Sequence, residues 1–118
     1  MALKLNDKGF AYAQKLIQGG LEVEIKECNW SAHKATADEV DKFVETHNIS
    51  EYAQWFLAID PAIADPNNLA RYQLPFGDLK IVHKSAIIDA QKQAAQKGAK
   101  DVEEAAKKLL QMISQIKR

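Results

Sequence analysis

The stretch from Trp55 to His83 limits most strongly what this chain can fold into. All three prolines of the sequence, Pro61, Pro66 and Pro75, lie inside it. Proline lacks a backbone donor and disfavours the α conformation in the residue before it, so the stretch cannot form one long helix. We therefore expect two short apolar segments joined by a turn-rich loop.

The two segments on either side of this loop are typical of a β-hairpin. Aromatic and β-branched residues at 54–59 favour a strand, although a helix over 52–59 is an alternative that the same side chains allow. A loop is expected over 60–70. The segment 71–76 then returns as a partner strand whose end is set by Pro75.

Helix signals precede the hairpin. The first helix is expected from Asn6 or Asp7 to about Gln18, before a pair of glycines. Alternating apolar and charged residues at 21–26 predict a short strand with one solvent-facing side. The sequence 36–39 is a capping box, which opens a second helix that ends near residue 47, and one helical turn can follow at 50–53.

Two further helices are expected after the hairpin. Asp78 is in position to cap a long helix from Leu79 to Lys97, and Gly98 ends it. Asp101 with Glu104 makes a second capping arrangement for a final helix. Because about three residues join them, these two helices should form an antiparallel pair.

The whole pattern predicts a single α+β domain over residues 1–118, mostly helical, with about four helices, a short strand or hairpin element and the C-terminal helix pair. Apolar residues make up 47% and charged residues 27% of the 118 residues, which is ordinary for a globular chain. We expect one hydrophobic core.

The charge balance bears on the kind of partner. Basic and acidic residues both number 16, so no overall field attracts nucleic acid or an anionic membrane. Residues 1–59 carry six lysines against nine acids, and residues 60–118 carry ten bases against seven acids. Nucleic acid is therefore not the expected partner, and binding through the basic C-terminal helix pair is kept as an alternative function.

The expected cellular location follows from the number of cysteines and the length of the apolar runs. The single cysteine, Cys28, excludes an internal disulfide and fits a reducing compartment. The first ten residues lack the pattern of a signal peptide, and no apolar run is long enough to cross a bilayer. We expect a cytoplasmic protein that does not associate with membranes.

Candidate chemical groups are few. The spacings of Cys28, His33, His47 and His83 match no structural zinc pattern, and no cofactor motif is present, so neither metal nor cofactor is expected. Asp60, Asp65 and Asp78 stand where turns and helix starts favour aspartate. A small enzyme that uses Cys28 or the pair Asp60 and Asp78 is the weakest of the functional hypotheses.

The motifs in the middle of the chain carry a resemblance. They are Asn29-Trp30-Ser31, Tyr52-x-x-Trp55-x-Leu57-x-Ile59-Asp60, Arg71-Tyr72-x-Leu74-Pro75-Phe76-Gly77-Asp78, and Val82-His83 before an alanine-rich helix. With these motifs the chain resembles, over about residues 29–116, a family of small bacterial proteins of unassigned activity. It is also similar, over a shorter segment, to phage head-associated proteins.

The resemblance implies an accessory or assembly-related module and supplies no catalytic residue. We expect a non-enzymatic protein-interaction module, with a protein as the partner, because the aromatic residues are crowded where chemical groups are lacking. The candidate contact residues are Trp30, Arg71, Tyr72, His83 and Lys84. Trp30 stands between polar neighbours and is the aromatic residue expected to be exposed.

Overall fold

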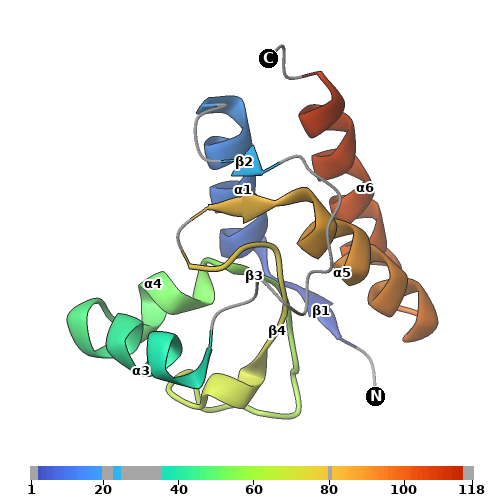
Figure 1. Cartoon of the computed structure of the whole chain (residues 1–118). Coiled ribbons are helices and arrows are strands. Elements are labelled where there is room, and N and C mark those ends of the chain that lie inside the picture. The colour runs from blue at the N-terminus through green and yellow to red at the C-terminus, as the bar shows by residue number, and fades with distance from the viewer. Residues whose placement is uncertain (1–2, 20–22, 25–35, 80, 116–118) are drawn as a thin grey trace.

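A three-stranded antiparallel sheet lies in the middle of the structure (Figure 1), which is a computed structural model that describes residues 3–19, 23–24, 36–79 and 81–115. Its strands, in spatial order, are β1 (Lys4–Leu5), β3 (Phe56–Ile59) and β4 (Tyr72–Pro75). Ala58 pairs with Gln73, and on its other side it faces Leu5. The hairpin expected from the proline pattern is therefore confirmed, and β3 is a strand rather than a helix.

Strand β3 is covered on both faces. Phe56, Leu57 and Ala58 are consecutive and all buried, and consecutive strand residues point to opposite faces of a sheet. Helices α1 (Asp7–Gly19), α5 (Lys84–Gln96) and α6 (Lys100–Ser114) pack against the sheet. This two-sided burial explains why the strand is a nearly continuous apolar run.

The N-terminal half follows the sequence pattern closely. Helix α1 has the expected bounds, and β2 (Val23–Glu24) lies within the strand expected over 21–26. Helix α3 (Ala37–Thr46) begins with the predicted capping box, in which the side chains of Thr36 and Glu39 each accept from the other residue's amide. Helix α4 (Ile49–Ala53) is the short turn before β3 and lies beside α3 (Figure 1).

The start of the long helix differs from the prediction. Helix α5 begins at Lys84, not at Leu79. Leu79 has φ +70°, and Asp78 forms a tight turn in which its backbone amide donates to the Ile81 carbonyl and its Oδ1 accepts from the Ile81 amide. Strand β5 (Val82–His83) follows and pairs in parallel with β2. Asp78 therefore caps a turn, because strand pairing with a distant segment replaces the first helical turn.

The C-terminal helix pair forms as expected, with one change in its capping. Gly98, at φ +71°, ends α5 in the left-handed conformation that glycine adopts without strain, and α6 then runs back along α5 (Figure 1). The capping pair predicted at Asp101 and Glu104 is wrong, since Ala99 is the N-cap residue and makes no side-chain cap. Asp101 lies inside the helix, and its Oδ2 accepts from the Leu5 amide of β1 at 2.9 Å.

One hydrophobic cluster joins these elements. It contains the aromatic residues of the hairpin, Ile17 of α1, and the apolar stripe of α6. The buried residues of that stripe are Val102, Ala105, Ala106, Leu109 and Ile113. Within the described residues, no helix is both long enough and apolar enough to cross a bilayer.

Candidate groove at the α1 and β3 junction

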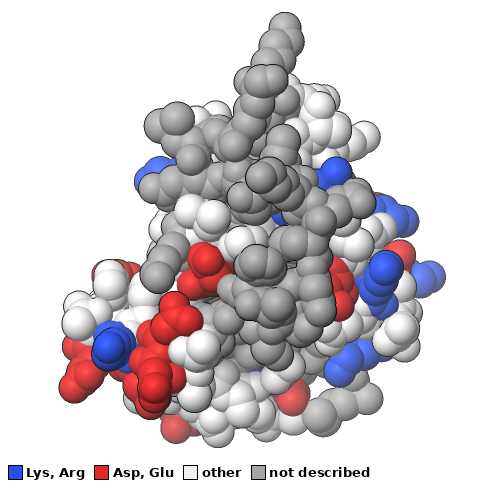
Figure 2. All heavy atoms as spheres, in the orientation of Figure 1, with Lys and Arg blue, Asp and Glu red and all other residues white. Residues whose placement is uncertain are grey.

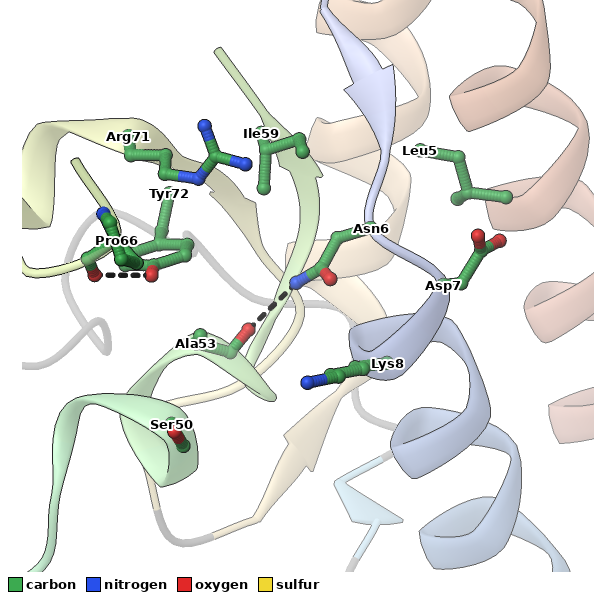
Figure 3. Close-up of a pocket in the computed structure, with 10 residues that line it drawn as sticks. All are labelled: Leu5, Asn6, Asp7, Lys8, Ser50, Ala53, Ile59, Pro66, Arg71 and Tyr72. Atoms are coloured by element: carbon green, nitrogen blue, oxygen red, sulfur yellow. Dashed lines mark hydrogen bonds between the residues drawn. The ribbon is translucent and has the colours of Figure 1, made fainter. Parts of the chain in front are cut away.

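A groove of about 400 Å³ lies where the start of α1 meets α4 and the hairpin loop (Figure 3). It contains Arg71 and Tyr72, two of the five contact residues expected from the sequence. The residues that line it are Leu5, Asn6, Asp7, Lys8, Ser50, Ala53, Ile59, Pro66, Arg71 and Tyr72. Its volume is near the lower end of ordinary ligand sites, about 300–1,000 Å³.

Asn6 holds the two sides of this groove together. Its Nδ2 donates to the carbonyls of Ala53 at 2.9 Å and Phe56 at 3.0 Å (Figure 3 draws the first). Its backbone amide donates to the Leu57 carbonyl at 2.8 Å. The residue expected as a helix cap therefore also fastens the start of α1 to α4 and β3.

Gly9 allows the close approach on which this junction depends. A Cβ at this position would lie 1.8 Å from the Phe56 carbonyl oxygen, far inside contact distance. Helix α1 can thus contact the β3 backbone directly because residue 9 has no side chain. The groove lies at the N-terminal end of the same helix.

The opposite wall is a loop held rigid by its own side chains. Asp60, Asp65 and Asn68 each accept, through a side-chain oxygen, from the backbone amide two residues ahead, which is a local turn that favours these residue types. Arg71 Nη1 donates to the Ile63 carbonyl, and the Tyr72 hydroxyl donates to the Pro66 carbonyl, both at 2.5 Å. Arg71 and Tyr72 therefore both stabilise the loop and line the groove.

The cations of the groove approach from opposite sides. Figure 3 shows the Lys8 ammonium pointing from α1 toward α4, and the Arg71 guanidinium pointing from the loop toward Ile59. The Asp7 carboxylate turns the other way, toward Leu5. The groove therefore presents more positive than negative charge to whatever enters it, above an apolar surface that includes Ile59.

An aromatic cluster supports the Tyr72 side of the groove. The Tyr52 ring lies 4.8 Å from that of Phe56 and 6.1 Å, edge on, from that of Tyr72, within the usual range for favourable ring pairs. Burial raises the pKa of Tyr52 above the ordinary 10.0, because an apolar surrounding disfavours the phenolate. Tyr52 thus packs as a neutral aromatic residue behind the groove.

The other contact candidates lie elsewhere. His83 is buried, and its Nε2 lies 3.1 Å from Asp78 Oδ2, so it does not offer the exposed surface that a contact residue needs. Lys84 is half-buried at the start of α5 and does not line the groove. Trp30 lies outside the described residues, as do Cys28 and His33.

The candidate chemical residues have backbone partners. Asp60 and Asp78 both accept from backbone amides, as the turn interpretation of these residues requires. His47 is exposed and stacks on Phe43, with ring centroids 4.2 Å apart. Over the described ranges, no group of three or more His, Cys, Asp and Glu side chains is arranged to hold a metal ion.

The charge asymmetry of the sequence becomes a spatial separation. Figure 2 shows acidic side chains gathered over α3 and basic ones over α5 and α6. On α6, however, Lys107 lies 3.7 Å from both Glu103 and Glu104. Exposed pairs of this spacing are typical of a solvated helix face.

No protein-family model, curated protein or solved structure matches the chain. The resemblance drawn from the central motifs therefore remains a hypothesis, and the groove is interpreted from its geometry alone.

Sequence reasoning missed most of the groove. Asn6, Lys8 and Ser50 belong to segments that lie more than forty residues apart, so no local pattern could group them. The one available signal is the glycine at position 9 of an otherwise good helix. Glycine inside a helix often marks a close backbone approach, but it does not say which backbone approaches.

Proposed function

We propose that this chain is a non-enzymatic protein-interaction module that binds a segment of its partner in the groove between α1, α4 and the loop before β4. One observation carries the proposal: Arg71 and Tyr72, chosen as contact residues from the sequence, line the same groove. Tyrosine and arginine are among the residues that contribute most to binding at protein interfaces.

The rigidity of the groove supports this function. Its loop wall is fixed by three side-chain turns and by the hydrogen bonds of Arg71 and Tyr72. A wall that is already ordered loses little conformational entropy on binding, which leaves more of the contact energy for affinity. A preformed groove of this size suits a few residues of a partner rather than a second folded surface.

The resemblance to phage head-associated proteins belongs to the same proposal. It assigns the module an accessory role in an assembly, where an extended segment of an assembly protein would be the occupant. The groove and the resemblance share Arg71 and Tyr72, which line the groove and belong to the motif that carries the resemblance.

Site-specific photocrosslinking in the cells that make the protein tests the proposal. A benzophenone amino acid replaces exposed Ser50 at the groove or, as the control, exposed Gln111 on α6. We expect a covalent adduct with one protein from position 50 and not from position 111, identified by mass spectrometry. The adduct should be lost when Tyr72→Ala is added to a chain whose circular dichroism shows that it remains folded.

Two outcomes contradict the proposal. Equal crosslinking from positions 50 and 111 means that the groove is not a preferred contact. An adduct that persists unchanged in the folded Tyr72→Ala variant means that the named surface does not hold the partner.

A further inference from the structure

The charges and shape of the groove indicate which kind of segment it accepts. Arg71 and Lys8 point into it from opposite walls, while Asp7 points away (Figure 3). We infer that the groove binds a short acidic segment of a protein, with one carboxylate held by Arg71, another by Lys8, and an apolar side chain placed against Ile59. This inference rests on the proposed function and adds the chemistry of the partner.

Arg71 is suited to a carboxylate. Its hydrogen bond to the Ile63 carbonyl comes from Nη1 alone, and a guanidinium carries about five donors in a planar fork that matches the two oxygens of a carboxylate. The bond to Ile63 also fixes the orientation of the fork, so little side-chain freedom is left to lose. Within the described part of the chain, Arg71 has no acidic partner of its own.

Lys8 adds a second positive charge that the fold does not use. It lies in the first turn of α1, is exposed, and has no ion pair among the described residues. A lysine in the first turn is unfavourable for the helix, because the N-terminal end already carries partial positive charge. An anion bound in the groove would offset this unfavourable interaction between Lys8 and the helix N-terminus.

The lining also limits the occupant to a mixed segment. Leu5, Ala53, Ile59 and Pro66 supply apolar surface beside the two cations. A uniformly charged chain would leave that surface uncovered, whereas a segment that alternates acidic and apolar residues would satisfy both. Alternate side chains of an extended segment point in opposite directions, so its acidic and apolar side chains can reach different parts of this lining.

The test uses a synthetic octapeptide that alternates glutamate and leucine, titrated into the ¹⁵N-labelled full chain at low salt. We expect the amide signals of Lys8, Ser50 and Arg71 to shift in a saturable way. A matched peptide that alternates lysine and leucine should leave these signals unchanged, because its charges repel both cations.

Two lysine variants separate a groove contact from general attraction. Lys8→Glu should weaken peptide binding about tenfold or more, and Lys108→Glu, on the exposed face of α6, should change it by less than about twofold. Both substitutions change the net charge by the same amount. Glutamate at position 8 favours the start of α1, so loss of folding would not explain a loss of binding.

The outcomes distinguish this inference from the proposed function. Equal weakening by both variants, or absence of shifts at the groove, overturns the acidic-segment inference, and an adduct from position 50 would still support the interaction module. Saturable shifts at the groove with a single-stranded oligonucleotide and not with the acidic peptide would assign the groove to phosphate and overturn it as well. If the peptide does not bind and no adduct forms from position 50, the groove is not the binding site and both proposals are wrong.

Discussion

The aromatic hairpin, residues 52–77, runs from Tyr52 of α4 through β3 and β4 to Gly77. It differs from the α5–α6 helix pair in how closely its parts approach one another. In the hairpin, backbone and aromatic rings approach closely at Gly77, because glycine has no side chain. A Cβ on Gly77 would lie 2.3 Å from the Ile81 carbonyl oxygen and 2.6 Å from the Trp55 ring. The Trp55 ring also stacks on Phe76 and meets Tyr12 edge on. The hairpin is therefore defined by contacts that have no space for an additional atom.

The helix pair depends on a repeated stripe instead. Five of its ten buried residues are alanines, such as Ala90 and Ala94, and four of the others are larger aliphatic residues, such as Val102 and Leu109. Small residues let the two helix axes come close, and no single contact dominates. The hairpin should therefore lose stability when an atom is added, and the helix pair should lose stability when atoms are removed.

Adding one methyl group at the hairpin should have the largest effect. Gly9→Ala places a Cβ against the Phe56 carbonyl oxygen, and α1 must move away from β3 to admit it. Overpacking costs about 1–3 kcal/mol and sometimes more, and against backbone we expect about 4 kcal/mol or more, measured by urea unfolding.

Gly19→Ala is the matched control for this substitution. Gly19 ends the same helix, and nothing lies within 4 Å of a Cβ there. Alanine should be neutral or raise the stability by about 0.5–1 kcal/mol. Equal stability of the two variants would contradict the close contact between α1 and β3.

Removing atoms from the helix pair should have the next largest effect. Leu109 is fully buried on α6, and Leu109→Ala should lower the free energy of unfolding by about 3 kcal/mol, through lost burial and the cavity left behind. Urea unfolding of Leu110→Ala, at the half-buried neighbouring position, should show a smaller loss. A reversed order would mean that the stripe of α6 is misassigned.

A smaller effect should come from the hydrogen bond that joins α6 to β1, the strand that pairs with β3 of the hairpin. Asp101→Ala removes the acceptor for the Leu5 amide and a favourable charge in the first turn of α6, so we expect a loss of about 1 kcal/mol. Hydrogen exchange at the Leu5 amide should become faster. Exposed Glu104→Ala in the same helix should leave that exchange rate unchanged, and faster exchange in both variants would refute a specific link.

The smallest effect is a pH dependence confined to the hairpin. The pKa of Tyr52 is raised by burial, so the folded state favours the neutral phenol more than the unfolded state does. Its contribution is fully present below about pH 10 and is lost as the pH rises through the folded-state pKa. The Tyr52→Phe variant should therefore lose less stability than the original chain between pH 9 and 11, as measured by urea unfolding. Equal losses in the two chains would contradict a raised pKa of Tyr52.

Local signals predicted the elements that depend on neighbouring residues. The capping box at Thr36, the glycine end of α5 and the hairpin around the prolines all formed as expected. The mostly helical α+β class followed from them. Each of these features depends on residues that are close in the sequence, so the sequence pattern contains the information needed.

The errors arose where a distant segment competed with a local preference. Asp78 has the residue type of a helix cap, but β2 pairs with Val82 and His83 and delays the helix to Lys84. Asp101 was expected to cap its own helix and instead accepts from Leu5, ninety-six residues away. His83 was chosen as a contact residue but lies in β5 and is buried.

The sequence alone therefore determined the fold class, most helix and strand positions and two residues of the candidate groove, because periodicity, capping and proline act locally. The tertiary structure decided that Arg71 and Tyr72 face Asn6, Lys8 and Ser50 across one groove. That arrangement depends on α1 meeting the β3 backbone at Gly9, and the energy of such a contact resides in the packing of segments that the sequence keeps far apart.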